Sequence, residues 1–300
     1  MARTEGLRAG SVVAAYGRRY RVEFPDGDFV ECSTRGKKSD IACGDRVNVR
    51  RSESDSGVIE AVLPRTTLLY RSDAHHQKLI AANVTQAVIV VAAKPGFYDE
   101  LINRCLAACA HAEIAVLIVL NKIDLPESAA AREALRIYER LGCRVLGLAA
   151  KQDVSPLRPL LASHTSVLVG QSGMGKSTII NSLIPDTNLR VAEISEALDS
   201  GRHTTTRTAL YHLDATSHII DSPGMQLFGL NHLSVEQTAD AFVEFRPFLG
   251  QCRFRDCRHM AEPNCAVAAA CVAGTIAASR LASYRKIAEE RMRAHAQRFD

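Results

Sequence analysis

The fold of this 300-residue chain is decided by the stretch Gly170-Gln171-Ser172-Gly173-Met174-Gly175-Lys176-Ser177. It satisfies the pattern G-x-x-x-x-G-K-[ST] and stands between an apolar run, Val167–Val169, and a segment of helical composition, Ser177–Leu183. A strand, a glycine-rich turn and a helix in this order form a phosphate-binding loop, because the glycines let backbone N–H groups turn towards the phosphates. The stretch therefore predicts a nucleotide site on an α/β sheet, and a glycine-rich turn without a ligand is the alternative.

Within this loop each polar group has an expected task. The Lys176 ammonium should reach the β- and γ-phosphates, and the Ser177 hydroxyl should ligate Mg²⁺. The helix that follows adds the positive end of its dipole to the phosphate site. The segment expected to contact the nucleotide comprises Gly170, Gln171, Ser172, Gly173, Met174, Gly175, Lys176, Ser177 and Thr178.

A second motif, Asn121-Lys122-Ile123-Asp124, predicts which base is bound. It ends the apolar run Ile114–Leu120, and so it lies at the carboxyl edge of a strand, where such sheets bind ligands. The Asp124 carboxylate can accept hydrogen bonds from guanine N1–H and the 2-amino group, whereas adenine offers neither donor. Asn121 can pair with the acceptor edge of the base and tie this loop to the phosphate loop, while the Lys122 stem covers the base. The motif predicts GTP rather than ATP.

The D-x-x-G element expected of a GTPase is Asp221-Ser222-Pro223-Gly224, after the short apolar strand His218–Ile220. Asp221 should approach Mg²⁺ directly or through water, and the Gly224 N–H should meet the γ-phosphate. Upstream of it, Gly201–Thr206 reads GRHTTT and is the expected first switch. Thr205 is favoured over its two threonine neighbours as the Mg²⁺ ligand. The alternative is that these threonines only begin a strand.

The source of water activation is less evident from the sequence. Met225 follows the D-x-x-G element at the place where many GTPases carry a glutamine that positions water. A thioether cannot position water, so we expect slow intrinsic hydrolysis. His203 in the first switch is the internal candidate to orient or deprotonate the water, and a structural role is its alternative.

The order of these motifs predicts a circular permutation. In ordinary GTPases the phosphate loop comes first and NKxD last, whereas here NKxD precedes the phosphate loop. The motifs can still meet in space if the original termini are close together. The second base-side loop is expected at Leu148–Lys151, where Ala149 takes the place of the usual serine.

The segment before the GTPase motifs has the pattern of a small β-domain. It contains five short runs rich in β-branched or aromatic residues, separated by turn signals. These are Ser11–Tyr16, Arg19–Phe24, Phe29–Cys32, Arg46–Arg51 and Val58–Val62. Their number and spacing favour an OB-type barrel, either as an RNA-binding module or as a neutral appendage.

The segment after the GTPase motifs combines helical composition with a Cys/His-rich loop. Helices are expected over Ser234–Phe245, Ala266–Ala278 and Thr275–His295. The loop has the spacing C-x4-C-x-H-x5-C, and its candidate ligands are Cys252, Cys257, His259 and Cys265. Three thiolates and one imidazole suit a closed, structural, tetrahedral Zn²⁺ site. Cys271 is a rival fourth ligand, and a disulfide is the alternative to a metal.

Composition limits the remaining possibilities. The net charge of +4 permits an anionic partner without requiring one, and the nine cysteines are too few for a disulfide scaffold. The longest apolar stretches, Ala87–Ala93 and Ile114–Leu120, are far shorter than the 18 or more residues that span a bilayer. No signal-like segment begins the chain. We therefore expect a cytoplasmic protein without membrane attachment, and a monomer by default.

Taken together, these features resemble the bacterial circularly permuted, small-ribosomal-subunit-dependent GTPases of the RsgA/YjeQ family. The resemblance covers essentially the whole chain, with Met174 (usually valine) and Ala149 as mild departures. It implies a multidomain α/β protein with an OB-fold over residues 1–72, a permuted GTPase domain over 73–231 and a helical zinc domain over 232–300. It also implies a role in late maturation of the 30S subunit, contacts with 16S rRNA, and GTP hydrolysis stimulated by that subunit.

Two other functions stay open at the level of sequence. One is a metal-dependent RNA-binding module with a vestigial nucleotide site, and the other is an ATP-using P-loop protein. A mechanistic hypothesis also follows from the permuted order. The second switch leads almost directly into the zinc domain, so GTP-dependent ordering of the switches could tilt that domain against RNA.

Overall fold

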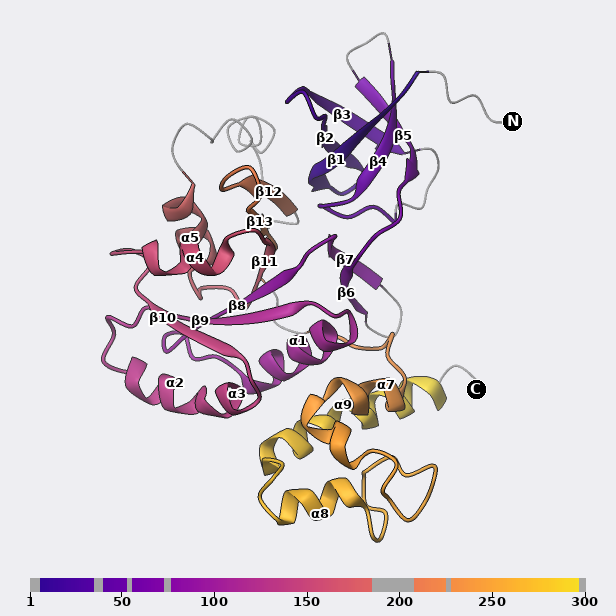
Figure 1. Cartoon of the computed structure of the whole chain (residues 1–300), viewed down its shortest axis with the longest axis vertical. Helices are drawn as coiled ribbons and strands as arrows, with labels where there is room; N and C mark the ends of the chain where they lie inside the picture. Colours follow the sequence, from indigo (N-terminus) through magenta and orange to yellow (C-terminus); the bar gives the residue numbers. More distant parts are fainter. Residues whose placement is uncertain are drawn as a thin grey trace.

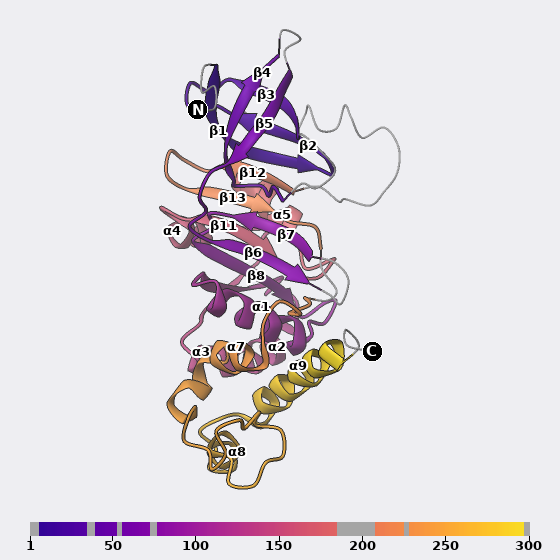
Figure 2. The same cartoon turned by 90° about the vertical axis from the view of Figure 1, so that its right-hand side faces the viewer.

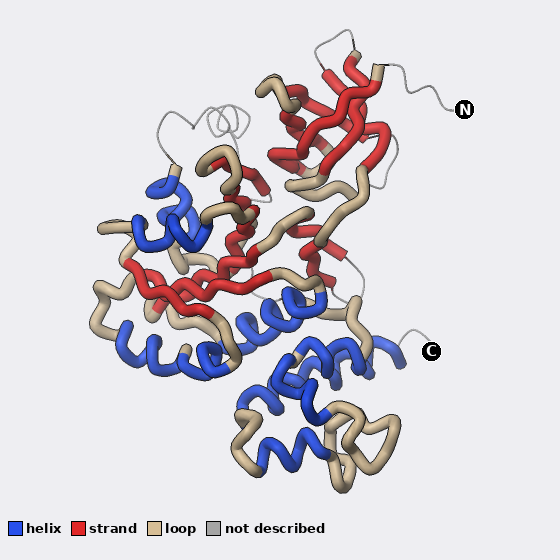
Figure 3. The backbone as a smooth tube through the Cα atoms, in the orientation of Figure 1, coloured by secondary structure: helices blue, strands red, loops and turns tan. Residues whose placement is uncertain are grey.

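The computed structural model describes residues 6–34, 40–52, 56–72, 77–184, 208–224 and 228–296. These residues form three parts stacked along the longest axis of the molecule (Figures 1 and 2). A β-barrel lies at one end, an α/β unit lies in the middle, and a helical unit with long loops lies at the other end. Figure 3 shows the contrast between the strand-rich first part and the helical last part.

The N-terminal part is a closed five-stranded barrel. Its strands are β1 (Leu7–Tyr16), β2 (Arg19–Glu23), β3 (Phe29–Thr34), β4 (Arg46–Arg51) and β5 (Ser56–Val62). The strand order is β1-β2-β3-β5-β4, and a β1–β4 pairing closes the circle. Alternate residues point inward, as in β4, where Val47 and Val49 are fully buried. The OB-type barrel expected from the sequence is confirmed.

The central part is built on a mainly parallel sheet in the order β10-β9-β8-β11-β13-β12. The strands are β8 (Gln86–Ala92), β9 (Ala115–Asn121), β10 (Arg144–Leu148), β11 (Thr165–Val169), β12 (Thr208–His212) and β13 (His218–Asp221). Only β12 is antiparallel to its neighbour in this sheet. All seven residues of β8 are buried, since helices cover both faces of the sheet.

The helices of the central part divide between the two faces of the sheet (Figure 1). On the face towards the helical domain lie α1 (Asp99–His111), α2 (Ser128–Ala134) and α3 (Arg136–Arg140). On the other face lie α4 (Arg158–Leu161), which the 3₁₀ turn η1 (Ser155–Leu157) precedes, and α5 (Lys176–Leu183). Leu135, which is fully buried, separates α2 from α3.

A two-stranded sheet that the sequence did not reveal joins the barrel to the central part. Its strands, β6 (Leu68–Ser72) and β7 (Gln77–Ala82), pair in antiparallel fashion, and β6 packs against α1. This pairing holds together residues on both sides of the boundary that the sequence placed between residues 72 and 73.

The C-terminal part contains α7 (Val235–Ala241), the 3₁₀ helix η3 (Val243–Phe248), α8 (Ala266–Val272) and α9 (Ala278–Ala296). Ser234 and Gln237 form a capping box that starts α7. The helix expected over Ser234–Phe245 breaks at Phe242, whose buried ring packs on Tyr284 with centroids 5.6 Å apart. The helix expected over Ala266–Ala278 ends early, because Gly274 adopts a left-handed φ of +78°.

Helix α1 connects the central part to the C-terminal part. Arg104, which is 4% exposed, donates to Glu100 of its own helix and to Glu290 of α9. Arg280 of α9, which is 2% exposed, donates to Asn103 and Glu244. The hydrophobic core on this face of the sheet continues into the helical domain. Within the described residues, no helix has both the length and the apolar character needed to cross a bilayer.

Candidate nucleotide site and metal centre

The phosphate loop has the backbone shape that its glycines permit. Gly170 follows β11 with a φ of +149°, and a Cβ atom there would lie 2.4 Å from the Val90 carbonyl oxygen. Gly175 has a φ of +95°, and a Cβ atom there would lie 2.2 Å from Asn121 Nδ2. Side chains at these two positions would collide with the sheet or with the base-side loop. Glycine is therefore needed at these two positions, both for the positive φ angles and for the close approach of Val90 and Asn121.

Lys176 lies inside the curve of the loop. Its Nζ donates to the carbonyl oxygens of Gly170 and Gln171, at 2.8 and 3.0 Å. Burial lowers the pKa of this ammonium, and the nearby carboxylate of Asp221 opposes the shift. A Cβ atom on Gly224 would lie 3.4 Å from Lys176 Nζ, so the D-x-x-G element contacts the phosphate loop. The elements expected to bind phosphate and Mg²⁺ thus meet at one edge of the sheet.

The other loop residues divide between core and surface. Met174 is 1% exposed and packs in the apolar core beneath the loop. The methionine in place of the usual valine therefore affects the packing of this core. Ser177 is exposed at the start of α5, and Thr178 behind it is half-buried. The Ser177 hydroxyl is therefore accessible to a bound ion.

Asn121 braces the base-side loops against the phosphate loop. Its Nδ2 donates to the carbonyl oxygen of Met174 at 2.9 Å. Its Oδ1 accepts from the backbone N–H groups of Lys122 and Ala150, at 2.8 and 3.0 Å. The side chain is 2% exposed, so these bonds are shielded from water. The expected tie between the loops is present, and through Ala150 it includes the second base-side loop.

Lys122 and Asp124, the residues expected to contact the base, lie at the turn that follows β9. Lys122 Nζ donates to the carbonyl oxygens of Lys94 and Gly173, at 2.6 and 2.8 Å, which fixes its stem across the loops. Ile123 is 44% exposed, and its N–H donates to the Leu148 carbonyl at 3.2 Å. The Asp124 carboxylate is exposed beyond this turn.

Sequence reasoning missed the segment Lys94–Tyr98, which lies beside the phosphate loop. The Tyr98 N–H donates to Gln171 Oε1 at 3.3 Å. A Cβ atom on Gly173 would lie 3.2 Å from the Pro95 ring. The signal that could have found this segment is its place directly after the buried run Val84–Ala93, at the carboxyl edge of the sheet.

The first switch and the residue after the D-x-x-G element lie outside the described residues. This applies to His203, to Thr205 and its threonine neighbours, and to Met225. Their expected roles therefore stay predictions.

The Cys/His-rich loop brings its four expected ligands together. The ligand atoms of Cys252, Cys257, His259 and Cys265 all lie within 4.8 Å of one another. His259 Nδ1 is 3.5, 3.6 and 3.4 Å from the three sulfurs in chain order, and the Cys252 and Cys265 sulfurs are 3.9 Å apart. Cys271, although described, is not part of this group. The loop is a metal-binding cluster of three cysteines and one histidine.

Two backbone N–H groups beside the cluster donate to cysteine sulfur atoms, as they would to thiolates. The N–H groups of Ala266 and Ala268 point at the sulfurs of Cys252 and Cys265, at 3.3 and 3.4 Å. Burial lowers the pKa of His259, which favours the neutral imidazole that ligates metal. Glu262 accepts from the backbone N–H groups of Arg258, Met260 and Ala261, and so it closes the turn.

The chain leaving the D-x-x-G element is clipped to β6 before it reaches the helical domain. The Ser72 N–H donates to the Gly229 carbonyl at 2.9 Å, and Asn231 N–H donates to the Ser72 carbonyl at 3.2 Å. Ser72 Oγ lies 2.8 Å from His232 Nδ1. Burial lowers the pKa of His232 to about 4, so this imidazole is neutral near pH 7.

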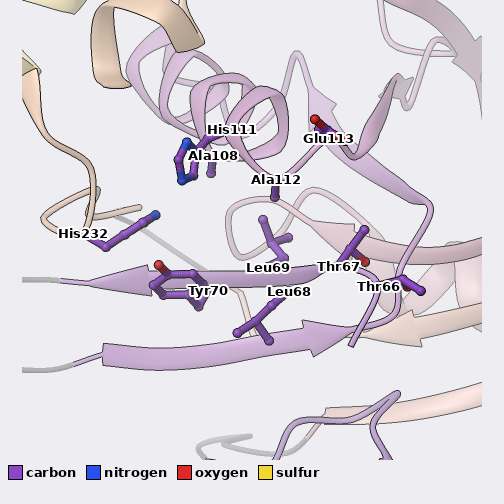
Figure 4. A pocket seen from close by; sticks show the side chains of 10 residues that line it. All are labelled: Thr66, Thr67, Leu68, Leu69, Tyr70, Ala108, His111, Ala112, Glu113 and His232. Atoms are coloured by element: carbon purple, nitrogen blue, oxygen red, sulfur yellow. The ribbon is translucent and has the colours of Figure 1, made fainter. Parts of the chain in front are cut away.

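Beside this clip lies a cavity of about 300 Å³, which Figure 4 shows from close by. It is bounded by the start of β6, by the C-terminal end of α1 and by His232. The rings of Tyr70 and His232 are in contact there, tilted by 38° with centroids 4.1 Å apart. The aromatic contact therefore forms part of the cavity wall.

Comparisons with known proteins identify the family of the chain. The family model described as RsgA GTPase matches residues 62–231. A small ribosomal subunit biogenesis GTPase RsgA from Nitrosospira multiformis is 52% identical over 279 residues, covering 93% of this chain and 89% of the relative. The protein of that name from Nitrosomonas europaea is 51% identical over 290 residues, covering 95% of this chain and 92% of the relative.

Solved structures agree as well. The crystal structure of YjeQ from Thermotoga maritima is 31% identical, with a TM-score of 0.72, and covers 95% of this chain and 99% of its own. YloQ, described as a circularly permuted GTPase, shares the fold at 24% identity with a TM-score of 0.66, covering 97% of each chain. The permuted order of motifs, their meeting at one sheet edge and these full-length relatives lead to one conclusion. The chain belongs to the RsgA GTPase family and is a hydrolase that acts on GTP.

Proposed function

We propose that this GTPase acts in the late maturation of the 30S ribosomal subunit, binds 16S rRNA and is stimulated by the subunit. The supporting observation is the nucleotide site itself, with guanine-reading, phosphate and D-x-x-G elements in contact, in a chain whose full-length relatives are named for small-subunit biogenesis. A vestigial site would not need the buried brace at Asn121 or the glycines that allow it.

The roles of the individual residues follow from their places. Asp124 would select guanine, and Lys122 would cover the base. When nucleotide binds, the Lys176 ammonium would exchange its hydrogen bonds to the carbonyls of Gly170 and Gln171 for bonds to the β- and γ-phosphates. Ser177 would hold Mg²⁺, with Thr205 as its partner from the first switch, and the ion would neutralise charge on the phosphates. The Asp221 carboxylate opposes the lowering of the Lys176 pKa, so it lies close to the phosphate loop. From there it would approach the Mg²⁺ ion.

Water activation is the step for which the chain offers the fewest groups. Met225 cannot orient water, so His203 is the proposed internal candidate. We expect slow hydrolysis alone and faster hydrolysis when the subunit orders the first switch or supplies a group of its own.

Zinc is the proposed occupant of the metal cluster. With Zn–S bonds of about 2.3 Å, a tetrahedral ligand set has sulfur–sulfur edges of about 3.8 Å. The Cys252–Cys265 separation of 3.9 Å fits this geometry. Four protein ligands leave no open position, so the ion would be structural. It would hold the loop that carries Arg253, Arg255 and Arg258, whose exposed charges suit contact with RNA.

We further propose that the nucleotide state reaches the helical domain through the second switch. The Ser72 clip fixes the chain at Gly229–His232, so only a short tether separates Gly224 from a fixed point. A change at the D-x-x-G element would therefore act on that point. We also propose a cytoplasmic monomer, as expected for a factor that works on ribosomal subunits.

Phosphate release with GTP and with ATP, with and without purified 30S subunits, tests the proposal. We expect slow release from GTP alone, a strong increase with subunits, and little release from ATP. Lys176→Ala should abolish release while leaving subunit binding measurable. If subunits left the GTP rate unchanged, the ribosomal role would be wrong, although the GTPase assignment would stand.

A further inference from the structure

The barrel is joined to the GTPase sheet strand to strand. Barrel strand β1 pairs with β12 at Ala14↔Ala209 and Ala15↔Thr208. Ala209 in turn lies opposite Asp221 on β13, and Asp221 lies opposite Leu168 on β11. One line of paired residues therefore runs from the barrel, through the D-x-x-G aspartate, to the strand that carries the phosphate loop.

This junction is narrow. Without the barrel, β12 would be an edge strand of the GTPase sheet, and β1 covers it with only two residue pairs. Beside the pairing lies a cavity of about 670 Å³, lined by residues of both parts, such as Phe24, Leu63 and Leu210. A short ladder next to a large cavity does not by itself fix the angle between two domains.

A chain of three side chains bridges the junction beside this cavity. Glu23 of barrel strand β2 lies 2.7 Å from His212 Nε2 of β12, through its Oε2 atom. His212 Nδ1 lies 2.8 Å from His218 Nδ1 of β13. We call Glu23, His212 and His218 the clasp. It joins the barrel to both strands of the β12–β13 pair, and that pair ends at Asp221.

The protonation of the clasp follows from its neighbours. The Glu23 carboxylate raises the pKa of His212, against the opposing effect of burial. Burial and the His212 charge lower the pKa of His218, while Asp214 and Glu23 oppose that shift. Arg46 of β4 also lines the cavity. When His212 is charged, it donates from both ring nitrogens, so His218 accepts at Nδ1 and carries its own proton on Nε2.

We propose that Glu23 is a positioning residue for GTP hydrolysis, acting through His212 to hold β12 and Asp221 in the hydrolytic geometry. The carboxylate lies on the barrel and acts on the reaction only through the β12–β13 pair. The inference rests on the GTPase activity of the family and not on the proposed ribosomal role. The barrel is thus a part of the catalytic framework.

The test compares Glu23→Gln with Glu60→Gln in the full-length chain. Glu60 is a matched control, because it is ion-paired with Arg50 on the same barrel and its side chain is 16% exposed, against 20% for Glu23. We expect Glu23→Gln to lower the single-turnover rate of GTP hydrolysis about fivefold at pH 7, within the range for coupling through packed networks. The affinity for a fluorescent GDP analogue and the melting temperature should stay close to those of the wild type.

The pH profile separates positioning from a merely structural role. Because the pKa of His212 is raised, the charged clasp is complete below that pKa and is lost as pH rises through it. The ratio of wild-type to Glu23→Gln rates should therefore shrink towards one as pH rises through the raised pKa of His212. Nitrogen-15 shifts of the imidazoles should show His218 protonated on Nε2 in the wild type at pH values below the pKa of His212.

Two results would overturn the proposal. One is a Glu23→Gln rate and pH profile that match those of the wild type and of Glu60→Gln. The other is a loss of GDP affinity equal to the loss of rate, because that would place Glu23 in ground-state nucleotide binding and not in the hydrolytic step.

Discussion

At the scale of single residues, Gly175 carries the tightest constraint in the nucleotide site. Its φ of +95° is costly for other residues, and a Cβ atom would lie 2.2 Å from Asn121 Nδ2. We predict that Gly175→Ala weakens GDP binding about 10- to 100-fold, since strain of 1–3 kcal/mol would displace the Asn121 brace or the loop. Titration with a fluorescent GDP analogue measures this change.

Gly142→Ala is the control for that prediction. Gly142 has a φ of +87°, close to that of Gly175, but open space surrounds its Cβ position. This variant should bear the same backbone strain and keep wild-type GDP affinity. Equal losses in the two variants would mean that backbone strain, and not the contact with Asn121, sets the affinity.

Residues of the site could be predicted from sequence where one short motif carries the chemistry. Lys176, Asn121 and the four candidate metal ligands are of this kind, because each belongs to a short motif with a characteristic spacing. Glu23 and His212 could not be predicted in this way. They are far apart in the sequence and meet only because β1 pairs with β12.

At the scale of elements, the metal loop should depend on its ion. It has little apolar core of its own, so binding energy of the metal is folding energy for this loop. We predict one equivalent of zinc in the wild type and in Cys271→Ser, and a large loss of zinc in Cys265→Ser. Elemental analysis of the purified proteins measures this. Loss of zinc in Cys271→Ser alone would show that the ligand set is wrong.

Element types were easier to predict than element ends. After Gln86, strand β8 is apolar throughout because helices cover both of its faces, and this pattern is visible without a structure. The breaks at Leu135 and Phe242 depend on which side chain fits the core of another element, so helical composition did not reveal them. The sequence did not reveal the β6–β7 pair, in which β6 also packs against α1.

At the scale of the whole molecule, permutation changes which parts are connected by the chain. The barrel is attached through β1 to the strand beside the D-x-x-G element, and the helical domain follows that element directly. The helical domain also shares a core with α1. The order of motifs predicted the second connection, whereas strand pairing alone revealed the first.

This arrangement predicts a shape that depends on the nucleotide. If the D-x-x-G element acts on the clip at Ser72, the helical domain should take different angles with GDP and with a non-hydrolysable GTP analogue. We expect different small-angle scattering curves for the two complexes, and tighter binding to 30S subunits with the analogue. Ser72→Gly removes the hydroxyl that meets His232 and loosens the clip, so it should shrink both differences while leaving GDP affinity unchanged. Identical scattering and identical subunit affinity in the two nucleotide states would show that no such coupling operates.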